Sequence, residues 1–141
     1  MRIVLSRRRL RPLNHPRLWY GIAYSMLLLV AILSLIPSPV MGVSDKLLHF
    51  MAYCALSAGF TTLNQHPGKL IAIALGLILY GVLLEILQGL TGYRRMDGMD
   101  MLANSAGAVT GLLVWLTPLP PWFRELELRL LKKLHQGVRY R

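Results

Sequence analysis

The stretch LIAIALGLILYGVLLEILQGL, residues 70–90, decides the fold of this chain. One carboxylate, Glu85, interrupts an otherwise almost wholly apolar run, and a helix of this length crosses the roughly 30 Å hydrocarbon core of a bilayer. The whole chain agrees, since 55% of its 141 residues are hydrophobic and its mean hydropathy is +0.48. A soluble domain needs far less apolar surface, so we predict an integral membrane protein.

Outward from this stretch, three further apolar runs predict three further spans. Leu18–Ile36 and Met99–Leu116 approach the length of about 20 residues that a transmembrane helix needs, and Leu47–Leu63 is weaker but long enough. We therefore predict an all-α, polytopic membrane protein with four transmembrane helices.

Prolines, glycines and short polar runs separate the first three predicted helices. Pro37 and Pro39 end the first helix, and Ser44 fits the N-cap of the second. Residues 64–68 and residues 91–98 are rich in turn formers. They separate the second helix from the third, and the third from the fourth.

The fourth helix is expected to begin close to Asp97 or Met99 and to stop at the prolines that follow residue 117. Beyond Pro121, apolar residues recur at helical spacing while basic residues fall elsewhere; the recurring residues are Phe123, Leu126, Leu130 and Leu134. This pattern predicts an amphipathic helix on the membrane surface. A partner-binding coiled coil is the alternative, although the stretch is too short for three heptads.

The net charge of +10 comes mainly from the two ends of the chain. Six arginines precede the first span without one acidic residue, and six basic residues follow the last span. Because an excess of Lys and Arg marks cytoplasmic flanks, both ends are expected in the cytoplasm. The chain then divides into a basic arm (1–17), a four-helix transmembrane domain (18–117) and a cytoplasmic amphipathic helix with a basic tail (118–141).

The same charges identify the expected partners. No aromatic-interleaved basic face or nucleic-acid motif accompanies them, so we expect contact with anionic membrane lipids and not with nucleic acid. The first apolar run is too long for the apolar region of a signal peptide, so it is expected to be retained as a span.

With cytoplasmic ends, polar residues on three helices converge near the outer boundary of the membrane. Residues three or four apart share a helix face. This places Asp45, His49 and Tyr53 on one stripe with Lys46 beside it, Glu85 and Gln88 on a second, and Asp97, Asp100 and Asn104 on a third. Gly107 and Gly111 continue the third stripe and predict a close helix contact below the polar groups.

Glu85 is the costliest of these residues to bury. An ionised carboxylate in hydrocarbon costs at least about 2.5–3.5 kcal/mol, so it needs a partner or a proton. Lys46, Arg94 and Arg95 are the available cations. The polar residues either pair only to hold the helices together or form a site, and their convergence on one side favours a site.

The motifs occur in a fixed order: Asp45-Lys46-Leu47-Leu48-His49-Phe50 with Tyr53, then Glu85-Ile86-Leu87-Gln88, then Arg95 with Asp100, Asn104, Gly107 and Gly111. This series resembles the VanZ-like family of bacterial membrane proteins over about Trp19 to Trp115. Arg95 and Asp100 fit the pattern better than Arg94 and Asp97. The resemblance implies a multi-pass protein of the bacterial cytoplasmic membrane. The named family member is associated with teicoplanin resistance, which implies a cell-wall precursor or glycopeptide as a candidate ligand.

Three uses of the predicted site remain open. In the first, Lys46 and Arg95 bind an anionic headgroup or cell-wall precursor without turnover. In the second, His49 and a carboxylate act as an acid/base pair on a lipid-linked phosphate, although no serine-nucleophile motif, HExxH or P-loop is present. The third, a proton or solute pathway, is disfavoured because the inner halves of the helices are apolar. A metal site would use His49, Glu85 and Asp100, but one histidine with carboxylates is a poor zinc set, so no metal or cofactor is expected.

Overall fold

The computed structural model describes residues 10–37, 43–64 and 66–139, and no strand occurs within them. The elements in chain order are α1 (Pro16–Leu35), α2 (Val43–Leu63), the 3-10 turn η1 (Pro67–Lys69), α3 (Leu70–Leu90), α4 (Gly98–Gly111), the 3-10 segment η2 (Leu112–Leu116) and α5 (Leu119–Arg139). The all-α prediction is confirmed. The predicted cap at Ser44 concerns a side chain outside the described residues.

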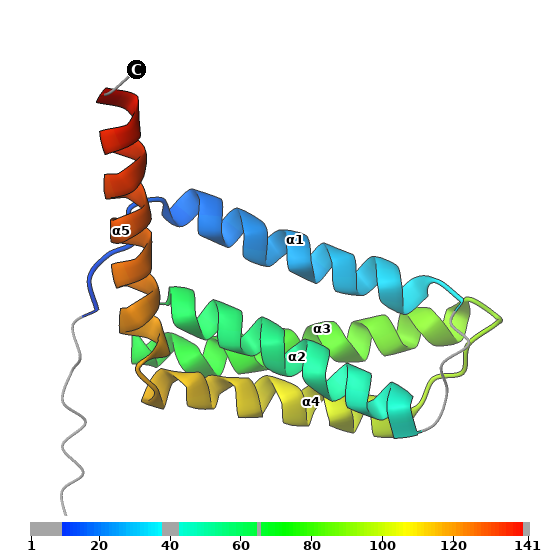
Figure 1. The fold of residues 1–141 in the computed structure, drawn as a ribbon. Helices are drawn as coiled ribbons and strands as arrows, with labels where there is room; N and C mark the ends of the chain where they lie inside the picture. Colours follow the sequence, from blue (N-terminus) through cyan, green and yellow to red (C-terminus); the bar gives the residue numbers. More distant parts are fainter. Residues whose placement is uncertain (1–9, 38–42, 65, 140–141) are drawn as a thin grey trace, which may run out of the picture.

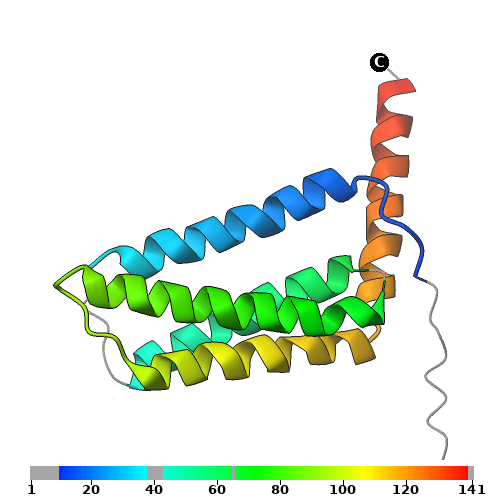
Figure 2. The same cartoon turned by 180° about the vertical axis from the view of Figure 1, so that it is seen from behind.

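Helices α1 to α4 run alongside one another as a bundle, and α5 crosses one end of it (Figures 1 and 2). The α5 end gathers the start of α1, the end of α2, the start of α3 and the end of the α4–η2 segment. The opposite end gathers the end of α1, the starts of α2 and α4, and the end of α3. Any polar group near a helix end therefore belongs to one of two separate neighbourhoods.

Three helical segments of the described chain are long and apolar enough to cross a membrane, namely Pro16–Leu35, Pro67–Leu90 and Gly98–Leu116. Helix α2 is as long as α3, but Asp45, Lys46 and His49 lie in its first two turns and lower its hydropathy. By length and composition the structure thus shows three candidate spans, where the sequence pattern predicted four.

Close packing of α2 against α4 organises the bundle. A Cβ added to Gly107 would collide with the carbonyl oxygen of Phe50, and one added to Gly111 would collide with that of Cys54. The predicted glycine contact is therefore confirmed, and it lies against α2. Nearby, the Ser57 hydroxyl donates a hydrogen bond to the Ala108 carbonyl at 2.6 Å, which satisfies a buried polar group inside the bundle.

The C-terminal helix begins earlier than the sequence pattern predicted. The prolines after residue 117 were expected to precede the helix, but α5 starts at Leu119 and holds Pro120 and Pro121 in its first turn. A proline is tolerated there because the first helical N–H groups have no acceptor within the helix. Likewise, α1 starts at Pro16, slightly before the predicted start.

Two buried side chains of α5 fasten it across the bundle. Arg124 donates hydrogen bonds to the carbonyls of Thr62 (2.8 Å), Leu63 (3.2 Å) and Asn64 (2.9 Å), which lie at the end of α2. Those carbonyls have no partner within the helix, so the guanidinium acts as a cap. We call Arg124 and Glu127, with the backbone groups that they bind, the α5 clamp.

Glu127 completes the α5 clamp at the start of α1. Its carboxylate accepts hydrogen bonds from the backbone N–H of Asn14 (3.0 Å) and His15 (3.1 Å) and from the Trp19 indole (2.8 Å). Burial alone would raise the pKa of Glu127, but these hydrogen bonds outweigh burial and hold the pKa below its ordinary value of 4.5. The Trp19 ring also packs edge-on against Phe123.

Candidate functional site

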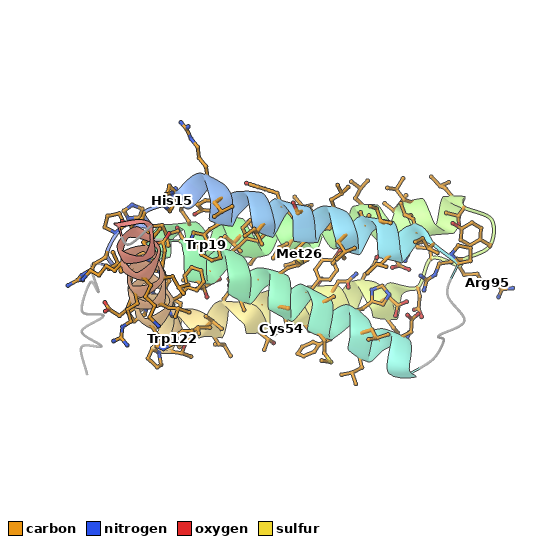
Figure 3. All side chains as sticks on the ribbon, turned by 45° about the horizontal axis from the view of Figure 1, so that its top comes forward. His15, Trp19, Met26, Cys54, Arg95 and Trp122 are labelled. Carbon is orange, nitrogen blue, oxygen red and sulfur yellow. The ribbon has the colours of Figure 1, made fainter. Side chains whose placement is uncertain are left out.

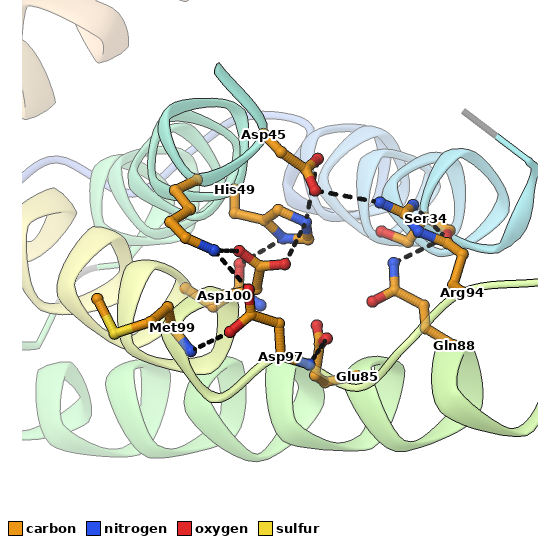
Figure 4. A network of polar contacts seen from close by, with 11 residues as sticks. Ser34, Asp45, His49, Glu85, Gln88, Arg94, Asp97, Met99 and Asp100 are labelled. Carbon is orange, nitrogen blue, oxygen red and sulfur yellow. Dashed lines mark hydrogen bonds and ion pairs between the residues drawn. The ribbon is translucent and has the colours of Figure 1, made fainter. Parts of the chain in front are cut away.

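A cluster of polar side chains occupies the end of the bundle opposite α5 (Figures 3 and 4). We call it the polar cluster; it consists of Asp45, Lys46, His49, Tyr53, Glu85, Gln88, Arg94, Asp97, Asp100 and Asn104. All but one of the residues that the sequence placed on its three stripes or offered as cations therefore come together here. The exception is Arg95.

Lys46 joins α2 to the start of α4. Its ammonium lies 2.5 Å from the Asp97 carboxylate and 3.0 Å from that of Asp100. Asp97 also caps α4, because its other oxygen accepts the backbone N–H of Met99 at 2.8 Å. Asp97 lies in the loop before α4, where the Lys46 ammonium holds the pKa of its carboxyl below the ordinary value.

Arg94 joins the loop after α3 to α1 and α2. Its guanidinium donates to Asp45 at 3.3 Å and to the Ser34 carbonyl at 3.1 Å. The same carbonyl accepts from the Gln88 amide at 2.8 Å, and the Tyr93 hydroxyl donates to the carbonyl of Leu35. Together these donors satisfy carbonyls at the end of α1, as a helix C-terminus requires.

The two arginines of this loop have different surroundings. Arg94 is half-buried within the polar cluster, whereas Arg95 is exposed, points away from the bundle (Figure 3), and makes no hydrogen bond or ion pair with a described residue. The structure thus gives Arg94 the place that the sequence pattern favoured for Arg95. Neighbouring residues of an irregular loop point in different directions, and no helical period predicts which one turns inward.

His49 lies at the centre of the polar cluster. Its Nδ1 lies 3.1 Å from the side-chain oxygen of Asn104, and because that oxygen can only accept, Nδ1 carries a proton. Its Nε2 faces Asp45 at 3.7 Å and Asp100 at 3.9 Å. Both separations exceed a normal hydrogen bond. One nitrogen is therefore fixed, and the other faces two carboxylate oxygens without bonding to them.

Glu85 has no ion-pair partner among the described residues. One carboxylate oxygen accepts the backbone N–H of Asp97 at 2.8 Å, while the other is buried and has no hydrogen-bond partner. Two of the three cations that the sequence offered to Glu85 are used elsewhere, Lys46 by Asp97 and Asp100 and Arg94 by Asp45, and the third, Arg95, points away from the bundle. The Tyr53 hydroxyl is likewise buried and unpaired.

The polar cluster is more acidic than basic. Four carboxylates face two cations, Lys46 and Arg94, so with every carboxylate ionised and His49 neutral the carboxylates exceed the cations by two. The closest group with metal-ligand chemistry is Asp45, His49 and Asp100, which offer one ligand atom each within 4.8 Å of one another.

An apolar groove runs from the α5 end toward the polar cluster. Its volume is about 440 Å³, and its lining includes Trp19, Met26, Leu33, Ala52, Leu56 and Phe123. Helix α1 contributes no fully buried residue, which leaves the groove open between α1 and α2. No residue of the polar cluster lines the groove, but Ala52 lies one helical turn from His49, so the groove ends about one turn from the cluster.

Comparison with known proteins identifies one family. The family model described as VanZ/LLP1 matches residues 5–120 of the chain, which include the bundle and the whole polar cluster. No curated protein and no solved structure matches the chain.

Proposed function

The chain belongs to the VanZ/LLP1 family of membrane proteins, and on that premise we propose that the polar cluster binds the anionic headgroup of an envelope lipid or lipid-linked cell-wall precursor. The observation that carries this proposal is the convergence of charged residues from three helices beside the end of an apolar groove. A ligand with a charged head and an acyl chain matches both features.

The proposal includes four spans, with α2 as the fourth. Helix α2 is 21 residues long, and its polar first turns lie where the headgroup region would begin. The basic residues before α1 and within α5 favour a cytoplasmic α5 end. The polar cluster then faces the outside of the bacterial cytoplasmic membrane, and α5 lies along the inner surface as an amphipathic helix.

Basic groups in and near the polar cluster provide contacts for a phosphate. Arg95 is exposed, and Lys46 remains about one-third exposed despite its two carboxylate partners. The guanidinium of Arg94 uses one N–H for Asp45 and one for Ser34, and its other donors remain for a ligand. Arginine is well suited to phosphate because its donors form a rigid fork.

Acid–base catalysis on a lipid-linked phosphate is the second candidate, and the position of His49 favours it. Asn104 fixes the tautomer through Nδ1, so Nε2 presents a lone pair toward the carboxylates. An imidazole oriented in this way can accept a proton from a substrate hydroxyl or water. Turnover of a radiolabelled lipid phosphate that disappears in His49→Ala would select this candidate over binding alone.

Lipid binding tests the proposal directly. Native mass spectrometry of the purified protein should show retention of phosphatidylglycerol over phosphatidylcholine. Arg95→Gln should reduce that preference, whereas Lys69→Gln, an exposed cation at the other end of the bundle, should not. Ala55→Trp should block the groove, while Ala72→Trp, which lines a different cavity, serves as its control. Equal retention by all four variants would contradict the proposal.

Topology has its own test. In a Cys54→Ala background, cysteines at Ser38 and Tyr93 should react with an impermeant thiol reagent in intact cells. Cysteines at Ser6 and Gln136 should stay unlabelled. The reverse pattern would place the polar cluster on the cytoplasmic side and refute the extracytoplasmic site.

A further inference from the structure

The two aspartates nearest His49 use their oxygens in the same way. Asp45 gives Oδ2 to Arg94, and Asp100 gives Oδ1 to Lys46. The remaining oxygens, Oδ1 of Asp45 and Oδ2 of Asp100, face Nε2 of His49 at 3.7 and 3.9 Å. Each carboxylate therefore has one oxygen held by a cation and one directed at the imidazole.

The nitrogen that they face carries no proton in the neutral ring. Nδ1 donates to Asn104, so Nε2 holds a lone pair. A lone pair and two carboxylate oxygens repel one another unless a proton or a metal cation lies between them, and at 3.7 and 3.9 Å the oxygens are too far from Nε2 for a normal hydrogen bond. Two ligands bound to one cation at about 2.0–2.4 Å lie at most about 5 Å apart, and the three atoms here all lie within 4.8 Å of one another.

Glu85 provides a second and independent indication of a ligand. The residue is 1% exposed, yet its Oε2 has no hydrogen-bond partner. In Figure 4 its carboxylate points into the space beneath His49 and Asp100. A buried carboxylate oxygen left unpaired is costly, and a metal-bound water directed at it would satisfy it.

We propose that Asp45, His49 and Asp100 bind one divalent transition-metal ion, of the Zn²⁺ or Mn²⁺ type. An imidazole ligand favours these ions over Mg²⁺ and Ca²⁺, which take oxygen ligands. Asn104, Arg94 and Lys46 bind the three ligands and orient them. In metal sites generally, outer residues that hydrogen-bond to the ligands have this role. The sequence pattern alone predicted no metal, because one histidine with carboxylates is a poor zinc set. Carboxylate ligands do suit Mn²⁺.

The ion explains how an acidic cluster receives an anionic ligand. The two carboxylates in excess over Lys46 and Arg94 would repel a phosphate, and a divalent cation offsets that excess. It also keeps an open coordination position for a phosphate oxygen. This inference rests on the proposed function in that it uses the same cluster, but the ion is expected to bind to the chain alone.

Metal binding to the purified protein tests the inference without any lipid ligand. The full chain, carrying no polyhistidine tag, is stripped with a chelator in neutral detergent and dialysed against Zn²⁺ or Mn²⁺, and bound metal is counted by elemental analysis. About one ion per chain is expected. His49→Ala and Asp45→Asn should each weaken binding more than about tenfold, and Asn104→Ala about tenfold.

Controls separate this site from adventitious binding. His66→Ala and Glu125→Gln alter exposed residues near the other end of the bundle and should bind metal like the wild type. Asp100→Asn serves if His49→Ala does not fold, as judged by thermal unfolding. A wild-type protein without saturable binding, or a cluster variant that binds as tightly as the controls, would overturn the metal site. Retained lipid preference in that case would leave the proposed function standing.

Discussion

The two ends of the bundle both bury charged side chains, but they use them differently. At the α5 end, Arg124 and Glu127 bind mostly backbone groups, and every hydrogen-bonding atom of their charged groups has a partner. In the polar cluster, charges from three helices face one another, and Glu85 keeps an unpaired buried oxygen. The only other buried unpaired side-chain atoms described are the neutral hydroxyls of Tyr53 and Thr61.

This difference distinguishes buried charges that hold the helices together from buried charges that are available to a ligand. A fully satisfied buried charge stabilises the arrangement that surrounds it, and nothing further can bind there. A buried charge without a partner costs stability unless a ligand supplies one, and such groups concentrate at functional sites. The α5 clamp therefore holds the helices, and the unpaired charge in the polar cluster supports the ligand site that we propose there.

The largest effect on stability is expected at Arg124. Arg124→Ala removes a charged donor and leaves the carbonyls at the end of α2 without their cap, which should lower the free energy of unfolding by about 3 kcal/mol. Arg129→Ala, on the exposed side of the same helix, loses only an exposed pair with Glu125 and should cost less than about 0.5 kcal/mol. Thermal unfolding in detergent measures both. If the two variants lost the same free energy of unfolding, Arg124 would be no more important to stability than an exposed residue of α5.

The pH dependence of the clamp follows from Glu127. Because hydrogen bonds hold its pKa in the folded protein below 4.5, its contribution to stability is present above pH 4.5 and is lost as the pH falls through the lower, folded value. Glu127→Gln should weaken α5 docking at neutral pH and reduce the acid-induced loss of stability. In a background with Trp115→Phe and Trp122→Phe, the fluorescence of Trp19 reports the docking across an acid titration. If the variant lost stability at acid pH as steeply as the wild type, Glu127 would not be the group responsible for that loss.

A smaller effect distinguishes two tyrosines. The Tyr80 hydroxyl donates to the Leu27 carbonyl at 2.6 Å, so Tyr80→Phe should cost about 1 kcal/mol. The buried Tyr53 hydroxyl has no partner, so Tyr53→Phe should be neutral or stabilising. Each substitution removes one hydroxyl oxygen, so the unfolding temperatures of the two variants compare the contributions of the two hydroxyls to stability. A greater loss in Tyr53→Phe would show that its hydroxyl is paired.

Much of the fold follows from local pattern. The run that became α3 has the predicted bounds, and helical period placed His49 above Tyr53 and Asp100 above Asn104. The same period predicted the close contact at Gly107 and Gly111, because small residues four apart share one face.

The rest depends on contacts between distant segments. Nothing in the spacing of Arg124 and Glu127 shows that α5 crosses the bundle, so their buried roles were missed; the sequence placed them simply on a surface helix. Truncation after Pro121 should remove these contacts, and thereby uncap α2 and expose the start of α1. Pairing within the polar cluster was also hidden, since several cations compete for four carboxylates and only the fold selects among them.

The central claim is that the polar cluster is a ligand site and that its charges do not serve only to hold the helices together. Glu85→Gln tests this claim most directly. This substitution removes the charge of a group that has no ion-pair partner among the described residues. We expect an unfolding temperature close to that of the wild type, together with loss of the preference for phosphatidylglycerol over phosphatidylcholine. His49→Ala and Asp100→Asn should behave alike. If these variants instead lose stability and lipid preference together, and neutral replacement of both Asp45 and Arg94 preserves both, the cluster holds helices together and the claim fails.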